Sequence, residues 1–192
     1  MGKENKSRYA IMGMLALKPA SGYQIKKLME ESTSNFWSES YGQIYPILKQ
    51  LTENGLATSH TEKQDGKPER TIYTLTSQGK AELLRWLSEP VEEAPARIEI
   101  LLKLFFGQLI PVEENISHIQ QFQEIQQGLL RKYHGIEMHL HDCLRDESSD
   151  RVETTYALLT VRFGIHRCQA LLAWCEESLA TLHKLRDRSE VS

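Results

Sequence analysis

The chain has 192 residues, a formal net charge of −3 and 40% hydrophobic residues. That length is sufficient for one or two small domains with cores of their own. The sequence starts with charged residues, has no apolar run of the roughly 18 residues that a membrane-spanning helix needs, and holds only three cysteines. These features argue against a secreted or membrane protein and predict a cytoplasmic one without a membrane partner.

The charge is unevenly distributed along the chain. Residues 1–90 hold 12 Lys and Arg against 10 Asp and Glu, a net charge of +2, whereas residues 91–192 hold 11 against 16, a net charge of −5. Contact with the phosphates of nucleic acid requires a cationic surface. The first half of the chain is therefore the expected place for such contact, and the acidic second half should face away from it.

Two segments of the first half begin with the same helix signal. Ser21 with Gln24, and Ser40 with Gln43, have the spacing of a capping box, in which the hydroxyl and the amide satisfy the first free N–H groups of a helix. Apolar residues then recur at helical spacing and predict one buried side for each helix. These residues are Ile25, Leu28 and Met29 in the first helix and Ile44, Ile47, Leu48 and Leu51 in the second.

The opposite side of the second helix carries residues suited to DNA contact. At about 100° per residue, Gly42, Pro46 and Lys49 point outward, with Tyr45 beside them. Tyr45 and Pro46 also fit a simpler role in packing and bending the helix, because Pro46 removes one backbone hydrogen bond. The neighbouring cation favours the DNA-contact interpretation.

A β-hairpin and a further helix are predicted next. Short runs at residues 56–62 and 70–76 flank Asp65-Gly66, a pair typical of hairpin turns. Thr76 or Ser77 can cap the following helix. The inner side of that helix is expected to consist of Ala81, Leu84 and Leu87. The order of helix, helix, helix, hairpin and helix predicts a winged helix-turn-helix with a two-stranded wing.

At these residues the sequence resembles the PadR family of transcriptional regulators. The resemblance covers the first half of the chain and implies a winged helix-turn-helix that binds DNA. The second half resembles the long-tailed PadR subgroup, with an all-helical, virulence-activator-like C-terminal region, in its length and helix pattern only. The matching features of the first half are Ser21-Gly22-Tyr23, Gly42-Gln43-Ile44-Tyr45-Pro46-Ile47-Leu48, Leu51, Asn54-Gly55-Leu56, Arg70, Tyr73-Thr74-Leu75-Thr76 and Gly79.

DNA contacts are expected from both helices and from the wing. Lys63, Lys67 and Arg70 around the hairpin can be solvated surface charges, but a wing is also where cations meet phosphate or the minor groove. The predicted DNA-binding residues are Ser21, Tyr23, Lys26, Tyr41, Gly42, Gln43, Tyr45, Pro46, Lys49, Lys63, Lys67 and Arg70.

The domain boundary is predicted near residues 88–96, where two prolines and an acidic cluster end the fourth helix. Residues 1–90 form the expected DNA-binding domain, and residues 91–192 form an expected all-helical domain for dimerisation and effector binding. Within the second domain, residues 98–109 are apolar on most sides, which suggests a helix wedged between other elements. A long helix follows from Pro111, and residues 146–150 form a turn.

The last helix, from about Arg151 to Arg186, carries two neighbouring apolar stripes, which indicates contact with two partners at once. A helix of this length spans about 50 Å, more than a compact monomer usually buries. We therefore expect a homodimer in which this helix contributes to the interface. One stripe is Val152, Tyr156, Leu159, Phe163, His166 and Ala170. The other is Leu158, Val161, Ile165, Cys168, Leu172, Cys175, Leu179 and Leu182.

The resemblance implies a planar phenolic or other aromatic effector that binds near the junction of the two domains. The aromatic candidates for such a pocket are Phe105, Tyr133, Tyr156, Phe163 and Trp174. Taken singly, each of them is better explained as a core aromatic.

Residues 134–143 include three histidines, one aspartate and one cysteine, all of metal-ligand type. Only His139 and Cys143 have a spacing that lets them share one ion, and a third fixed ligand is missing, so no metal site is predicted. Cys168 and Cys175 are expected to be buried thiols, and His166 to be a core histidine.

We therefore predict a homodimeric repressor of transcription that binds an inverted-repeat operator in double-stranded DNA and is relieved by a small aromatic effector. The alternative is a winged-helix module that binds another protein without binding DNA, against which Lys26, Lys27 and Lys49 argue. The sequence contains no nucleophile–base constellation, Gly-rich phosphate loop or paired-acid motif, so neither catalysis nor a cofactor is expected.

Overall fold

A computed structural model describes residues 6–34, 36–62, 69–92, 97–146 and 150–189. The chain divides into two compact units, Met1–Glu93 and Ala94–Ser192, three residues beyond the boundary expected from the sequence. In the described parts of the chain, no helix is long and apolar enough to cross a membrane.

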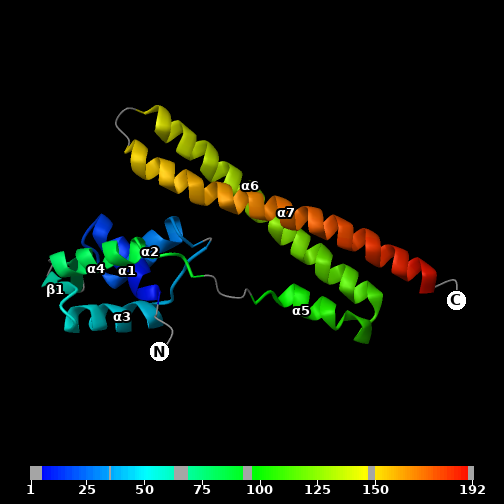
Figure 1. Ribbon diagram of the computed structural model, residues 1–192, viewed down its shortest axis with the longest axis horizontal. Coiled ribbons are helices and arrows are strands. Elements are labelled where there is room, and N and C mark those ends of the chain that lie inside the picture. The colour runs from blue at the N-terminus through cyan, green and yellow to red at the C-terminus, as the bar shows by residue number, and fades with distance from the viewer. Residues whose placement is uncertain (1–5, 35, 63–68, 93–96, 147–149, 190–192) are drawn as a thin grey trace. The chain divides into compact units, whose positions relative to one another are not determined.

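The first unit has the predicted order of elements, which is therefore confirmed (Figure 1). Three helices are followed by an antiparallel two-stranded sheet and a fourth helix. Their bounds are α1 Ser7–Leu17, α2 Gly22–Glu31, α3 Tyr41–Glu53, β1 Ala57–Glu62, β2 Arg70–Leu75 and α4 Ser77–Leu87.

The ends of α2 and α3 are fixed by local hydrogen bonds. Gln24 Oε1 accepts from the Ser21 backbone N–H at 2.9 Å, and Gln43 Oε1 accepts from the Ser40 N–H at the same distance, so both predicted capping boxes are present. Helix α3 ends at Glu53 with Asn54 as its C-cap, and Gly55 follows with a φ of +69°, the left-handed conformation that glycine favours. The Leu56 N–H then returns to the Leu51 carbonyl at 2.8 Å, as in a Schellman motif.

The core of the first unit lies between α1, α2 and α3. Ile25 and Met29 of α2 and Ile44 and Leu48 of α3 are fully buried there, together with residues of α1. The predicted inner sides of α2 and α3 are thus confirmed for these residues. Burying one large apolar side chain stabilises a fold by about 1.5–3 kcal/mol, so this cluster fixes which side of α3 remains outside.

The hairpin is attached to the turn between α1 and α2. Strands β1 and β2 pair in a register that runs from Ala57 opposite Leu75 to Glu62 opposite Arg70. Ala20 and Tyr73 exchange two backbone hydrogen bonds, of 3.1 and 3.0 Å, which joins β2 to the start of α2. The predicted Asp65-Gly66 turn lies outside the described residues.

The inner side of α4 differs from the prediction. Ala81, Leu84 and Leu87 are exposed, whereas Leu83 is buried and Trp86 packs partly against the core. The correction is a rotation of about one position, 100°, around the helix. Leu83 and Leu84 are adjacent, so apolar spacing within α4 left two choices, and contact with α1 decided between them.

The second unit consists mainly of two long helices that run back along each other (Figure 1). Its elements are α5 Glu99–Phe105, the 3-10 helix η1 Gly107–Leu109, α6 Val112–Arg145 and α7 Arg151–Ser189. The core of the helix pair contains Tyr133, Val161, Ile165 and Cys168. Cys175 is also fully buried, so both predicted buried thiols are confirmed; burial raises the pKa of each thiol.

Helix α7 buries only one of its two apolar stripes within the chain. The stripe from Leu158 to Leu182 is buried or half-buried, whereas every residue of the stripe from Val152 to Ala170 is exposed. His166 belongs to the exposed stripe, so its prediction as a core histidine is wrong. The second neighbour that this stripe implies is not among the described elements of the second unit.

Helix α5 is likewise exposed, which corrects the prediction of a wedged helix. None of its residues is buried, and Leu102 and Phe105 expose 62% and 79% of their surfaces. Leu109 of η1 exposes 76%. Only Ile100 and Leu104 of α5 are half-buried, where the helix contacts α6. The unit offers one long helix pair and no further described layer to cover the other apolar side chains.

Candidate nucleic-acid interface

The outward side of α3 is open to solvent as the sequence predicts. Gly42, Tyr45, Pro46 and Lys49 are all exposed, opposite the buried Ile44 and Leu48. Pro46 stands inside the helix without ending it. The Lys49 ammonium lies 3.8 Å from the Glu53 carboxylate, and its side chain remains 77% exposed. At such exposure the ion pair is weak, so the lysine is free to exchange its partner for a phosphate or a base edge.

Three exposed tyrosines are stacked across α2 and α3. The Tyr41 ring lies between those of Tyr23 and Tyr45, with centroids 6.4 Å away in both cases and planes inclined by 7° and 25°. Each of the three residues keeps more than 40% of its surface exposed. We call Tyr23, Tyr41 and Tyr45 the tyrosine row. It presents apolar ring edges and phenol hydroxyls beside the outward face of α3.

Two predicted contact residues also have structural roles at helix starts. Ser21 is 8% exposed, and its hydroxyl accepts from the Gln24 N–H at 3.3 Å. Ser21 thus caps α2, and its role as a DNA contact stays a prediction. Gln43 is exposed, but its amide oxygen accepts from both the backbone N–H and the hydroxyl of Ser40. This bonding holds the first turn of α3 in place.

The cations of α2 and the wing already have acidic neighbours. Lys26 lies 3.3 Å from Glu30 and its side chain is only 18% exposed. Arg70 donates from Nε and Nη2 to Glu62 Oε2, at 3.0 and 2.7 Å, and with His60 it holds the pKa of Glu62 below its usual value. A phosphate at the wing would share Arg70 with Glu62. Lys63 and Lys67 lie outside the described residues.

A charged cluster that the sequence did not reveal joins α1 to α4. Glu82 of α4 accepts hydrogen bonds from Arg8 Nη2 at 2.7 Å and from the Tyr9 hydroxyl at 3.0 Å. Arg85 Nη2 lies 2.8 Å from the same carboxylate. The Arg85 hydrogen bond, followed by those of its neighbours, lowers the pKa of Glu82 to about 2. A periodic pattern cannot predict this cluster, because Arg8 and Tyr9 are 74 and 73 positions away from Glu82 in the sequence.

The five aromatic residues expected to line an effector pocket do not gather in one place. Phe105, Tyr156 and Phe163 are exposed, and Tyr133 is buried in the core of the α6–α7 pair. Of these four residues, only Tyr133 is a core aromatic. Trp174 meets Phe122 edge-on, with ring centroids 6.1 Å apart.

One apolar hollow lies in the first unit, between α1, α4 and the segment after α2. It has a volume of about 330 Å³, and Tyr9, Trp37, Trp86 and Phe36 line it together with aliphatic residues. Lys6 stands at this hollow and lies 3.3 Å from Glu92. None of the five predicted aromatics contributes to it.

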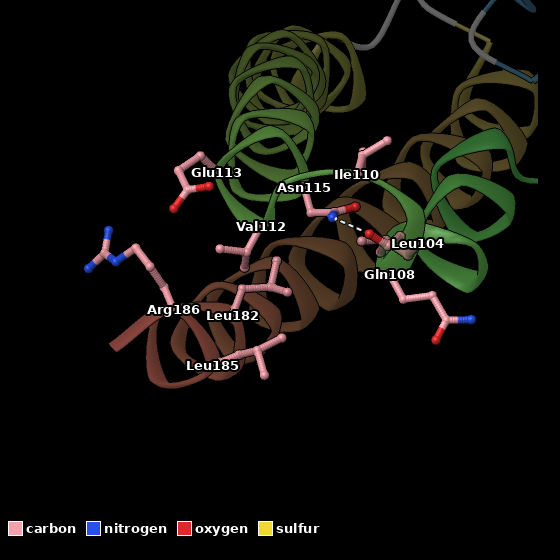
Figure 2. Close-up of a pocket in the computed structure, with 10 residues that line it drawn as sticks. Leu104, Gln108, Ile110, Val112, Glu113, Asn115, Leu182, Leu185 and Arg186 are labelled. Atoms are coloured by element: carbon pink, nitrogen blue, oxygen red, sulfur yellow. Dashed lines mark hydrogen bonds between the residues drawn. The ribbon is translucent and has the colours of Figure 1, made fainter. Parts of the chain in front are cut away.

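A larger hollow of about 630 Å³ lies in the second unit, where η1, the start of α6 and the end of α7 meet (Figure 2). Leu182 and Leu185 of α7 and Val112 of α6 form its apolar wall. Asn115 Nδ2 donates to the Gly107 carbonyl at 2.9 Å and ties η1 to α6. No predicted pocket residue lines this hollow either.

The candidate metal ligands of α6 form at most a pair. The Cys143 sulfur lies 3.7 Å from His139 Nε2. In the described part of the chain, no three His, Cys, Asp or Glu side chains come together as a metal site.

Comparison with protein families assigns each half of the chain. A model described as the transcriptional regulator PadR-like family matches residues 11–85, and one described as the virulence activator alpha C-terminal region matches residues 96–183. The resemblance found in the sequence is confirmed for both halves.

Characterised relatives match over nearly the whole length. The negative transcriptional regulator PadR of Bacillus subtilis is 31% identical over 179 residues, which cover 92% of this chain and 97% of the relative. The crystal structure of B. subtilis PadR in complex with operator DNA has a TM-score of 0.75 at 30% identity, and covers 93% of this chain and 99% of its own. The same protein in complex with p-coumaric acid has a TM-score of 0.72 at 28% identity, with the same coverage. These matches confirm the mainly α fold with a winged helix-turn-helix and a helical C-terminal region.

Proposed function

Because the chain belongs to the PadR-like family of transcriptional regulators, we propose that it is a cytoplasmic, homodimeric repressor that binds operator DNA and is released by a small aromatic effector. The observation that carries the proposal is the outward face of α3, where Tyr45, Pro46 and Lys49 are exposed opposite a fully buried stripe. In a helix-turn-helix, this is the face that enters the major groove.

Contact with DNA follows from the chemistry of that face. Lys49 supplies a cation that can pair with a guanine edge or a phosphate, and the tyrosine row supplies hydroxyl donors and apolar ring edges. The wing supplies Arg70, with Lys63 and Lys67 as further candidates from the sequence. The negative regulator of B. subtilis was crystallised with operator DNA, which supports the same activity here.

Dimerisation is supported by the apolar surface that the second unit leaves uncovered. Tyr156, Leu159 and Phe163 expose 68%, 58% and 66% of their surfaces along one side of α7. Such a contiguous stripe is typical of an interface between subunits. Two copies related by a twofold axis would present two α3 helices to an inverted repeat with half-sites about one helical turn, or a multiple of it, apart.

An aromatic effector is supported by the hollow between α1 and α4. Its walls carry four aromatic rings, and the Lys6 ammonium stands at its edge, so a planar ring with a carboxylate would find both an apolar slot and a cation. The B. subtilis relative was crystallised with p-coumaric acid, a ligand of this chemistry. An effector there would change the packing of α1 against α4 and thereby the position of the two DNA-binding faces.

The test begins with selection of duplexes from a randomised pool by the wild-type protein, followed by gel-shift titration at low and high salt. The expected result is one selected inverted repeat that binds much more tightly than its scrambled form, with affinity that falls as salt rises. If no duplex is selected and no binding occurs at low salt, the chain does not act on DNA. That outcome would favour the alternative, a winged-helix module that binds protein.

A further inference from the structure

Gly22, the first residue of α2, lies directly against the ring of Tyr45 in α3. A Cβ atom built on Gly22 would stand 2.7 Å from Tyr45 Cε1 and 2.9 Å from Cζ. Real Cβ atoms do not approach other atoms so closely. The glycine is not required by its backbone, because Gly55 alone has a positive φ in the described part of the chain. Gly22 is therefore needed for the close approach of the ring.

The contact lies on the inner edge of an otherwise exposed side chain. Tyr45 keeps 49% of its surface exposed, while its ring touches Gly22 on one side and stacks with Tyr41 on another. Tyr41 in turn stacks with Tyr23, the residue that follows Gly22. The row thus begins at Tyr23 of α2 and ends at Tyr45, whose ring contacts Gly22, the residue before Tyr23.

We infer that Gly22 is a positioning residue for DNA recognition, which sets the Tyr45 ring and with it the tyrosine row on the outward face of α3. The inference rests on the proposed function. A ring that is already held in place loses less side-chain freedom when it meets DNA. Its edge can then contact a thymine methyl group, and its hydroxyl a phosphate or a base.

A purely structural role for Gly22 predicts a different outcome. If the glycine mainly let α2 and α3 pack closely, an added methyl group would push the helices apart and lower the melting temperature. The atoms that Cβ would meet, however, belong to the far end of one exposed side chain. The ring can move while the helices stay, and alanine is favoured over glycine inside a helix. We therefore expect the fold to tolerate Gly22→Ala and the tyrosine row to be displaced.

The experiment compares Gly22→Ala with Gly13→Ala, a matched control. Gly13 lies in α1 of the same unit, and a Cβ there has no heavy atom within 4 Å. Gly13 lines the hollow between α1 and α4, so both variants are compared without effector. Both variants should melt at or above the temperature of the wild type. On a duplex selected by the wild-type protein from a randomised pool, Gly22→Ala should bind about five- to tenfold more weakly, whereas its affinity for the scrambled duplex should stay within about twofold. Gly13→Ala should match the wild type on both duplexes.

Combining Gly22→Ala with changes at Tyr45 tests the route of the effect. In a Tyr45→Ala background the ring is gone, so Gly22→Ala should change the affinity for the selected duplex by less than about twofold. In a Tyr45→Phe background the clashing ring carbons remain. The loss of affinity for the selected duplex, about five- to tenfold, should therefore persist.

The inference is overturned if Gly22→Ala melts below the wild type, binds the selected duplex like the wild type, or loses the same factor in affinity in the Tyr45→Ala background. An equal loss of affinity for the selected and the scrambled duplex also overturns it, because that pattern indicates a general loss of DNA binding and not a loss of recognition. If the wild type selects no duplex, the proposed function itself fails, and the inference fails with it.

Discussion

The ring of Tyr9 lies flat against the ring of Trp86, with centroids 4.4 Å apart and planes within 5° of each other. This stack connects α1 to α4, and the Tyr9 hydroxyl adds a hydrogen bond of 3.0 Å to Glu82 of α4. Both rings also line the hollow of the first unit. Aromatic stacking and a charged hydrogen-bond cluster thus meet at the same place.

The Glu82 cluster should contribute measurably to the stability of the fold. Glu82→Gln removes the charge that Arg8 and Arg85 share, and should lower the free energy of unfolding at pH 7 by about 1–3 kcal/mol. The control is Glu89→Gln, which removes a more exposed partner of Arg85 and should cost less than about 1 kcal/mol. Urea unfolding of the three proteins measures both differences.

The same cluster should make stability depend on pH in a defined direction. The pKa of Glu82 falls from its ordinary value of 4.5 to about 2 in the fold, chiefly through the Arg85 hydrogen bond. A carboxyl with a lowered pKa stabilises the fold at pH values above its ordinary pKa. This contribution disappears as the pH falls through the lowered pKa. The difference in unfolding free energy between wild type and Glu82→Gln should therefore shrink as pH falls from 4.5 toward 2. A difference that stays constant over this window would contradict the assignment.

Lys49 and Lys67 should affect DNA binding in different ways. Lys49→Ala is expected to cost about 1–3 kcal/mol on the selected duplex and to relax preference at one base position in each half-site. Lys67 is expected at the wing, so Lys67→Ala should weaken selected and scrambled duplexes alike and make the salt slope shallower by about one unit per subunit. The control is Lys103→Ala in α5, which removes another exposed lysine with an acidic partner one turn away.

A salt titration of these variants on both duplexes measures the difference. Equal losses for Lys49→Ala on both duplexes would mean that Lys49 only neutralises charge. If neither variant loses affinity, the winged helix does not contact DNA through these elements.

The exposed stripe of α7 should form the dimer interface. Light scattering of the wild type at micromolar concentration should give about twice the chain mass of 22.1 kDa. Phe163→Glu should produce monomers, because burying an unpaired charge in the interface costs several kcal/mol, roughly 3–5. Met138→Glu in α6 is the control, since Met138 is 67% exposed against 66% for Phe163 but lies outside the stripe.

A wild-type monomer at that concentration would end the proposal. From the two stripes alone, the sequence predicts Leu172→Glu as the interface variant. Leu172 is half-buried on the stripe that packs within the α6–α7 pair, so this substitution should instead lower the melting temperature of the unit.

The tryptophans should identify the effector site. p-Coumaric acid is the probe, and its binding is followed by the change in tryptophan fluorescence. Binding should also raise the melting temperature, because a ligand selective for the folded state stabilises it by mass action. If the acid occupies the hollow between α1 and α4, Trp86→Phe should remove most of the fluorescence change, and Trp174→Phe should leave it intact. The reverse pattern would place the site near Trp174, as the sequence led us to expect, and no response to a range of aromatic acids would remove the effector from the proposal.

The sequence by itself determined the order of the elements, the starts of α2 and α3, and which side of α3 faces outward. These features depend on residues within about four positions of one another, so spacing alone encodes them. Where two residues within one helix satisfied the same spacing, as Leu83 and Leu84 do in α4, the sequence left the choice open.

Only the tertiary structure decided what distant segments do to each other. The contact of Gly22 with Tyr45, the cluster around Glu82, and the aromatic hollow between α1 and α4 all join residues more than 20 positions apart. The exposure of α5 and of the Phe163 side of α7 was decided in the same way, because a side chain is buried only when another element lies against it. An apolar pattern says that a partner is required, and the packing of the chain shows whether that partner comes from within it.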